Sequence, residues 1–115
     1  MGGCVSQNKY EVHYYRTIYG VEPFKAWLLD IREKKDRKIV QRRLHRAEEG
    51  NLGSTRYVGN GVGEIKIDYG PGYRIYFGFG YNEKLILLLG GTKSTQKHDI
   101  LKSQFYWEDY HRRIK

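Results

Sequence analysis

The chain has 115 residues and a formal net charge of +8, from 21 Lys and Arg against 13 Asp and Glu. This length supports one hydrophobic core. A content of 39% hydrophobic and 30% charged residues excludes a disordered chain. The longest aliphatic run, residues 85–89, is too short to span a membrane. One Cys and four scattered His exclude an intrachain disulfide and leave no metal-ligand spacing, so we expect no metal and no cofactor.

The first residues carry a possible lipidation signal. Residues 1–6 fit the M-G-x-x-x-S pattern for N-myristoylation, with Cys4 placed for palmitoylation. We interpret residues 1–8 as a disordered leader rather than a membrane anchor, and residues 9–115 as a single domain. No basic segment followed by an apolar one opens the chain, and a single Cys suits a reducing compartment, so we expect a cytoplasmic protein.

The first half of the domain predicts one strand and two helices. Residues 9–18 are rich in Tyr and Val with charged residues between them, which is typical of a strand. Pro23 suits the first turn of a helix, and hydrophobic residues then repeat at helical spacing, so we predict a helix that ends near Lys35. A second helix is expected from Asp36 as N-cap to Gly50. Its inward positions are Val40, Leu44 and Ala47.

The second half predicts four strands. These are a short strand near residues 56–58, a hairpin with arms 64–68 and 73–79, and a buried strand at residues 85–89 that stops at Gly90 and Gly91. A three-residue Gly-Pro-Gly loop would pair Tyr69 with Tyr73, Ile67 with Ile75 and Lys66 with Tyr76. One face of the hairpin is then apolar, and the other carries Glu64, Lys66, Asp68, Arg74 and Tyr76.

A final helix is expected after the buried strand. Ser94 or Thr95 can cap it, and Asp99 in its first turn suits the helix dipole. Its inner seam would be Ile100, Trp107, Tyr110 and Ile114. A first strand, two helices, a run of strands and a final helix predict an α+β fold, with helices packed on a mainly antiparallel sheet of four to five strands.

Several motifs together resemble the RelE/HigB superfamily of bacterial toxins, and in particular its addiction-module killer protein branch. They are Phe24, Trp27 and Leu28 at helical spacing, then residues 50–53 (GNLG), 61–64 (GVGE), 68–77 (DYGPGYRIYF) and 87–96 (LLLGGTKSTQ). The resemblance implies a RelE-like fold with two N-terminal helices and a C-terminal helix. It also implies the toxin of a type II toxin–antitoxin module, an mRNA interferase that cleaves message on the ribosome and inhibits translation. A cognate helix-turn-helix antitoxin, in a heterotetramer with the toxin, is the implied partner.

The resemblance also implies roles for individual residues. It matches Arg74 to the phosphate-binding arginine, Lys66 to a catalytic lysine, and Lys93 to a basic residue after the last strand. The chain departs from the pattern at Glu64, where the best-known members carry a second lysine. Members of the superfamily use a His or Tyr near the C-terminal end, and His98 is the nearest candidate here.

The chemistry of these residue types suits RNA cleavage without a metal. The 2′-hydroxyl of RNA can attack its own phosphate if a site orients it, offsets the charge on phosphorus and manages two protons. Arginine suits the phosphate because its guanidinium is planar and always charged. Glu64 is a candidate general base and His98 a candidate general acid, while Tyr76 is a candidate for base stacking and Gln96 for RNA contact.

The positive charge lies mostly on the expected helices. Residues 25–49 hold nine Lys and Arg against five Asp and Glu, and residues 93–115 hold six against three. A basic surface favours polyanions, and it is also a common means of solubility. The helical arginines that we assign to RNA contact are Arg42, Arg43 and Arg46, although a solvated helix face explains them equally well.

Three alternatives remain open at the level of sequence. Toxins of the ParE type share this fold and poison DNA gyrase without a ribonuclease site, and a fold alone does not separate the two. A non-catalytic nucleic-acid-binding module is a third class. The polar face of the hairpin is also explained by ordinary solvent exposure, with Asp68 and Arg74 as a cross-strand ion pair.

Overall fold

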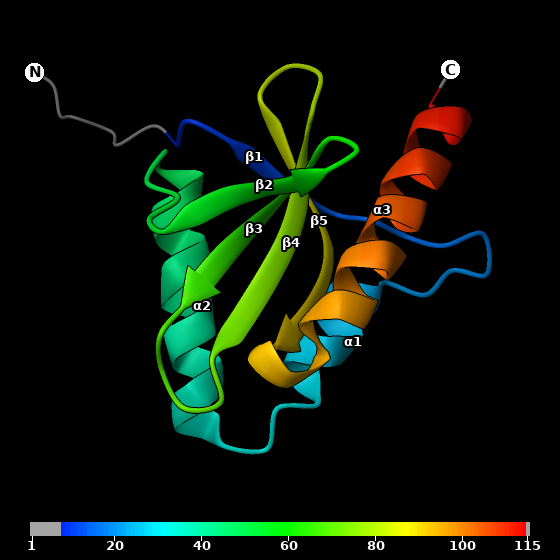
Figure 1. Ribbon diagram of the computed structural model, residues 1–115. Helices are drawn as coiled ribbons and strands as arrows, with labels where there is room; N and C mark the ends of the chain where they lie inside the picture. The colour runs from blue at the N-terminus through cyan, green and yellow to red at the C-terminus, as the bar shows by residue number, and fades with distance from the viewer. Residues whose placement is uncertain (1–7, 115) are drawn as a thin grey trace, which may run out of the picture.

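Five strands form one mixed sheet at the centre of the computed structural model, which describes residues 8–114 (Figure 1). The strand order is β1-β5-β4-β3-β2; β1 pairs in parallel with β5, and the other three pairings are antiparallel. The strands are β1 (Glu11–Tyr14), β2 (Thr55–Gly59), β3 (Val62–Ile67), β4 (Tyr73–Gly80) and β5 (Lys84–Thr92). The leader expected at residues 1–8 lies outside the described residues except for Asn8, which is exposed and has no regular structure.

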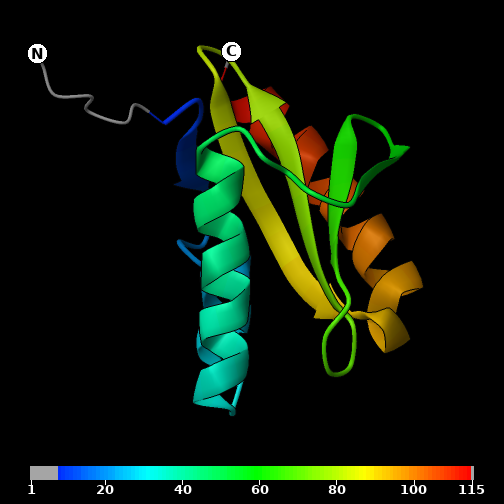
Figure 2. The ribbon, with the colours of Figure 1, turned by 90° about the vertical axis from the view of Figure 1, so that its left-hand side faces the viewer.

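Helices cover both faces of this sheet, which confirms the α+β class. They are α1 (Pro23–Leu29), α2 (Lys34–Glu48) and α3 (Gln96–Arg113). Figure 2 shows α2 on one side of the sheet and α3 on the other, so that the sheet is a middle layer. Each face therefore has its own hydrophobic cluster, one under α1 and α2 around Phe24, Ile65 and Leu87, the other under α3 around Tyr76, Leu88 and Trp107.

The expected helix boundaries were wrong between residues 30 and 36. Helix α1 ends at Leu29 rather than near Lys35, and α2 begins at Lys34 with Glu33 rather than Asp36 as its N-cap. Asp36 lies within the first turn of α2, where its carboxylate accepts a hydrogen bond from the Tyr73 hydroxyl at 2.6 Å. That contact to β4 fixes the start of α2 against the sheet, which helical periodicity alone does not reveal.

The register of the β3–β4 hairpin differs from the expected one by two residues. Ile67 pairs with Tyr73 rather than with Ile75, and Lys66 pairs with Arg74 rather than with Tyr76. The loop spans residues 68–72, where Gly72 adopts a positive φ of 81°. Because a shift of two residues preserves the side of the sheet on which each side chain lies, the expected face grouping survives. Asp68, however, lies in the loop and not opposite Arg74.

Strand β5 does not stop at Gly90 and Gly91 but runs through them to Thr92. A Cβ atom at Gly90 would lie 2.0 Å from the Trp27 ring, and one at Gly91 would lie 1.9 Å from the Asp99 carboxylate. The two glycines therefore allow α1 and α3 to approach opposite faces of the same strand. They are packing positions rather than strand breakers.

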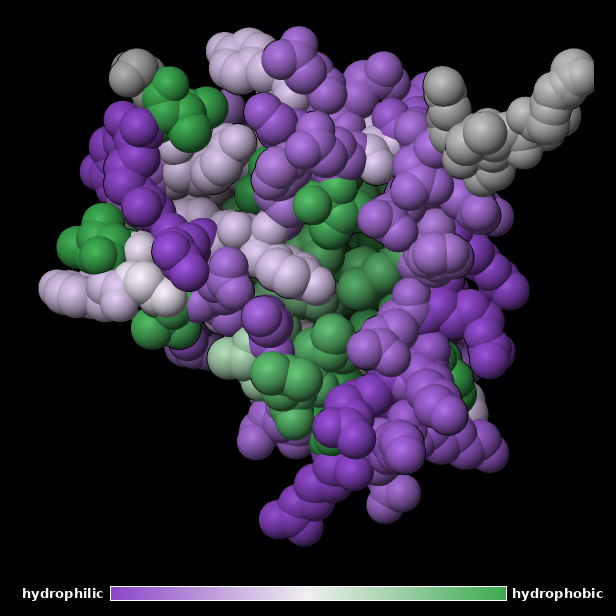
Figure 3. Space-filling model, turned by 180° about the vertical axis from the view of Figure 1, so that it is seen from behind, coloured by the Kyte–Doolittle hydropathy of each residue, from purple (hydrophilic) through white to green (hydrophobic). Residues whose placement is uncertain are grey.

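The C-terminal helix follows a short 3₁₀ turn, η1 (Lys93–Thr95), and Thr95 is its N-cap as expected. Trp107 lies on the inner side of this helix and is buried, whereas Ile114 is 42% exposed. The buried side of the helix therefore ends earlier than predicted. Figure 3 shows the side of the molecule that faces away in Figure 1, where hydrophobic side chains lie in a hollow at the middle and hydrophilic ones lie around them. Within residues 8–114, no helix has the length and hydrophobicity needed to cross a membrane.

Candidate functional site

Three basic side chains meet at one end of the sheet. A pocket of about 330 Å³ lies where the β3–β4 loop approaches the start of η1. The polar face of the hairpin supplies Lys66 and Arg74, and the residue after β5 supplies Lys93, as expected from the sequence. The full lining is Lys66, Asp68, Tyr69, Gly70, Pro71, Gly72, Arg74 and Lys93.

Arg74 is the least satisfied charge in this pocket. It is only 3% exposed, although its place on the polar face of the hairpin would suggest an exposed arginine, and that interpretation is wrong. Its Nη1 donates to the Tyr73 carbonyl at 3.1 Å, its Nε has no hydrogen-bond partner, and it forms no ion pair within residues 8–114. The buried Asp99 carboxylate lies beside Gly91, the residue opposite Arg74 on β5, but not within ion-pair distance of the guanidinium, and a buried charge without an ion pair is unfavourable. An anion in the pocket would therefore relieve a cost already present in the fold.

The two lysines are accessible and flank this arginine. The Lys66 ammonium is half-exposed and lies 4.0 Å from the Asp68 carboxylate. Lys93 is exposed, and its backbone N–H donates to the Gly72 carbonyl at 2.8 Å, which fixes η1 against the loop. A Cβ atom at Gly72 would lie 3.3 Å from both Arg74 Nη1 and Lys93 Cβ. The glycine thus keeps open the space between two of the cations.

Glu64 lies on the same face but does not reach the pocket. Its carboxylate is 1% exposed and accepts hydrogen bonds from Arg56 Nε at 2.8 Å, from the Tyr76 hydroxyl at 2.9 Å and from Gln96 Nε2 at 2.9 Å. Burial alone would raise its pKa, but the three hydrogen bonds and the Arg56 charge outweigh burial and hold the pKa below its ordinary value. Glu64 is therefore a buried, engaged carboxylate, and the geometry does not suit the general-base role expected for it.

Two further side chains belong to this buried network rather than to an RNA surface. Tyr76 is fully buried, and burial, followed by the hydrogen bond to Glu64, raises its pKa well above the ordinary value. Its ring is not available for stacking on a base in this structure. Gln96, the first residue of α3, uses its side-chain amide to hold Glu64. Together they fasten the start of α3 to the middle of the sheet.

The remaining expected site residues lie away from the pocket. His98 is exposed in the first turn of α3 and does not line the pocket. Arg43 is half-buried and donates to the Lys66 carbonyl at 3.2 Å, and burial, followed by the neighbouring Arg46, lowers its pKa. Arg42 and Arg46 are exposed on α2, on the opposite face of the sheet from α3.

Sequence reasoning missed Tyr69 in the pocket wall and the nearby cation Arg56. Tyr69 lines the pocket because the hairpin loop is longer than expected, and Asp68, expected on the strand, lines it from the same loop. The position of Tyr69 next to the Gly-Pro-Gly segment could have indicated that it lies near the site, because binding residues are often found on loops. Arg56 on β2 donates a hydrogen bond to Glu64, and no local sequence pattern predicts this contact.

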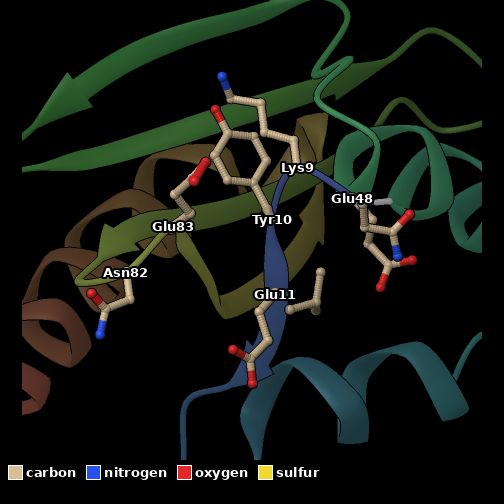
Figure 4. A pocket seen from close by; sticks show the side chains of 8 residues that line it. Lys9, Tyr10, Glu11, Glu48, Asn82 and Glu83 are labelled. Atoms are coloured by element: carbon tan, nitrogen blue, oxygen red, sulfur yellow. The ribbon is translucent and has the colours of Figure 1, made fainter. Parts of the chain in front are cut away.

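Other cavities offer less chemistry. A polar depression of about 480 Å³ lies beside the start of β1, but its carboxylates point apart rather than toward a common point (Figure 4). An apolar groove of about 700 Å³ between the β1–α1 connection and α3 is lined by residues such as Ile18, Tyr19 and Phe105. In the described part of the chain, no group of three or more His, Cys, Asp or Glu side chains is placed to hold a metal ion.

Comparison with known proteins shows a relative of this chain but no matching family model. No protein-family model matches the chain. The chain is 36% identical over 81 residues to an uncharacterized protein of Haemophilus influenzae, across 70% of this chain and 82% of that protein. The match therefore extends over most of both chains, while the name of the relative states no activity.

Proposed function

We propose that this chain, which belongs to the same family as the uncharacterized Haemophilus influenzae protein, is the toxin of a type II toxin–antitoxin module. The proposed toxin inhibits translation by cleaving messenger RNA. The likeness of the motifs between Phe24 and Gln96 to the RelE/HigB superfamily supports this proposal, and so does the α+β fold class. A RelE-like arrangement, a cytoplasmic location and a helix-turn-helix antitoxin that assembles with the toxin are parts of the same proposal.

The observation that carries the proposal is the unpaired, buried guanidinium of Arg74 beside Lys66 and Lys93. A pocket with three cations selects an anion, and a planar guanidinium with free N–H groups suits the oxygens of a phosphodiester. The lining includes the hairpin loop, residues 68–72, so the pocket lies at the tip of the hairpin, where a phosphate of an RNA backbone can approach. Three cations also disfavour a divalent metal ion at the same place, so the proposed cleavage is metal-independent.

The cleavage is an internal transfer at phosphorus. With the scissile phosphate against Arg74, the 2′-oxygen forms a bond to phosphorus and the bond from phosphorus to the 5′-oxygen breaks. A water molecule takes the proton from the 2′-hydroxyl, and the Lys93 ammonium gives a proton to the departing 5′-oxygen, while the Lys66 ammonium adds positive charge beside the phosphate. Arg74 offsets the charge that develops on the phosphate oxygens. The products are a 2′,3′-cyclic phosphate and a 5′-hydroxyl.

The position of Glu64 and His98 explains why such an enzyme would depend on the ribosome. Glu64 is fully engaged under α3, and His98 does not line the pocket. The site then binds and neutralises a phosphate but does little to align the 2′-hydroxyl. Orientation of reacting groups is worth several kcal/mol, on the order of 7–11 at best. A ribosome that holds the message in the reactive geometry supplies this contribution.

The same observation supports a second candidate, a module that binds nucleic acid without cleaving it. Two assays separate the candidates. Purified protein is added to translating ribosomes and the message is mapped for breaks, and a parallel gyrase supercoiling assay tests the ParE-like alternative. Broken message with active gyrase supports the proposal. Intact message with inhibited gyrase favours the ParE-like function, and intact message with active gyrase favours the binding module.

A further inference from the structure

Arg56 on β2 is an exposed arginine held by a buried carboxylate. Its Nε donates to Glu64 Oε1 at 2.8 Å, with the Arg56 side chain 61% exposed and the Glu64 side chain 1% exposed. The hydrogen bond and charge of Glu64 raise the pKa of Arg56 further above its ordinary value. The guanidinium is thus permanently charged and fixed in place at one edge only.

The free edge of this guanidinium is available to a ligand. Arginine carries five N–H donors in a rigid fork, and only the Nε–H of Arg56 is used within residues 8–114. Because Glu64 is itself anchored by Tyr76 and Gln96, the support beneath Arg56 is rigid. Little side-chain freedom is left to lose when the terminal nitrogens bind an anion, and such preorganisation favours affinity.

The strand register places Arg56 beside the phosphate pocket. Arg56 lies directly opposite Glu64 on β3, and Lys66 lies two residues further along β3 on the same face. Lys66 in turn lies opposite Arg74 on β4. Diagonal neighbours across two strands are about 7–8 Å apart. Three cations on three adjacent strands therefore form a row from the pocket toward the β2 edge, at a spacing that suits successive phosphates of one RNA strand.

We propose that Arg56 binds a second backbone phosphate, next to the one bound in the Arg74 pocket, so that the ligand is an RNA strand spanning at least two successive phosphates. This inference rests on the proposed function, because it extends the same site. Glu64 is then a positioning residue that aims Arg56 rather than a catalytic base. The hydrogen-bond network around Glu64 would then position Arg56 as well as hold α3 against the sheet.

The alternative role of Arg56 is to neutralise Glu64 and nothing more. The two roles differ in their dependence on ligand length. A second phosphate contact matters only for a ligand that has a second phosphate, whereas a purely structural defect weakens every ligand equally or lowers stability alone. Arg112 provides a matched control because it is 59% exposed and lies 4.0 Å from a carboxylate, that of Glu108, near the far end of α3.

The test is an NMR titration with two non-cleavable 2′-O-methyl RNA probes, a dinucleotide with one phosphate and a tetranucleotide with three. Parent, Arg56→Gln, Arg56→Lys, Arg74→Gln and Arg112→Gln are compared, with thermal unfolding as a check of folding. We expect Arg56→Gln to weaken tetranucleotide binding roughly tenfold, as for one charge-assisted contact, while dinucleotide affinity stays unchanged. The salt dependence of tetranucleotide binding should fall by about 0.7 in slope. Arg56→Lys should restore part of the affinity.

Each outcome separates this inference from the function on which it rests. Arg74→Gln should weaken both probes, and Arg112→Gln neither. If Arg74→Gln weakens both probes but Arg56→Gln leaves the tetranucleotide unaffected, or weakens both probes equally, the second-phosphate inference is wrong and the proposed function stands. If Arg74→Gln leaves both affinities unchanged, the phosphate pocket itself is wrongly assigned.

Discussion

Lys66 and Arg74 lie directly opposite each other on β3 and β4, and Arg74 has no carboxylate partner within residues 8–114. Like charges at directly opposite positions destabilise a sheet, and the buried guanidinium adds its own desolvation penalty. A fold under selection for stability alone has no reason to keep this pair. The arrangement is explained if the two cations share an anionic ligand, and binding sites commonly trade stability for function in this way.

Replacement of Arg74 by Met should separate function from stability. Arg74→Met keeps the volume and removes the unpaired charge, so the free energy of unfolding should stay equal or rise by about 1 kcal/mol. RNA cleavage should fall by roughly 100-fold or more, as when one donor to a developing charge is lost. Chemical denaturation and a cleavage assay measure the two effects. Arg112→Met serves as the control and should change neither; a strongly destabilised Arg74→Met would mean that the guanidinium has a partner we have not identified.

The loop glycine Gly72 should matter through the space it leaves open. Gly72→Ala introduces a Cβ atom 3.3 Å from Arg74 Nη1 and from Lys93 Cβ, at a residue with φ of 81°. Gly20→Ala is matched to it, because Gly20 has φ of 83° and nothing within 4 Å of its added Cβ. Both variants should lose about 1 kcal/mol of stability from backbone strain. Only Gly72→Ala should also weaken phosphate binding, and equal binding losses in the two would contradict this geometry.

The Glu64 carboxylate should make stability depend on acid pH. Its pKa in the folded protein is held below the ordinary value of 4.5. The stabilisation is therefore fully present above about pH 4.5 and is lost as the pH falls through the folded pKa. Glu64→Gln should lower the free energy of unfolding at pH 7 by about 2–4 kcal/mol, because an amide cannot accept from all three donors.

The pH profile of this variant provides the control for the Glu64 prediction. Equilibrium unfolding between pH 3 and pH 7 should show a shallower loss of stability in Glu64→Gln than in the parent. The exposed carboxylate of Glu108 offers a comparison, and Glu108→Gln should remain within about 0.5 kcal/mol of the parent. Parallel profiles for parent and Glu64→Gln would show that Glu64 does not titrate as described.

The proposed function implies a partner that binds the protein tightly and neutralises it. The chain carries a net charge of +8, and a partner that covers its basic face with acidic and apolar side chains would be attracted from a distance. Co-expression with the adjacent reading frame should relieve growth inhibition, and the two proteins should co-purify. The prediction fails if toxicity is unchanged and the proteins elute separately.

The grouping of Lys66, Arg74 and Lys93 was predictable from sequence for a simple reason. Side chains alternate along a strand, so the face on which Lys66 and Arg74 lie survives any even shift in register. The register itself was not predictable, because it depends on a loop of residues 68–72 that is longer than the Gly-Pro-Gly segment suggests. The expected grouping was therefore right although the expected pairs were wrong.

The burial of the site was beyond local reasoning. Alternation of polar and apolar residues predicted one solvent-facing side of the hairpin, but α3 folds back over that side and buries Glu64, Arg74 and Tyr76. Only a tertiary contact, from Gln96 on α3 to Glu64 on β3, turns an apparently exposed acid into the centre of a hydrogen-bond network. Similarly, the sequence predicts that a strand ends at Gly90 and Gly91. Only the structure shows that these glycines leave room for Trp27 and Asp99.

The most direct test of the central claim is the chemistry of the RNA ends. Message bound to translating ribosomes is incubated with the protein, and the ends of the fragments are identified. The account predicts a 2′,3′-cyclic or 3′-phosphate on one fragment and a 5′-hydroxyl on the other, with no cleavage by Arg74→Met. Fragments that carry 5′-phosphates, or cleavage that Arg74→Met retains in full, would contradict it.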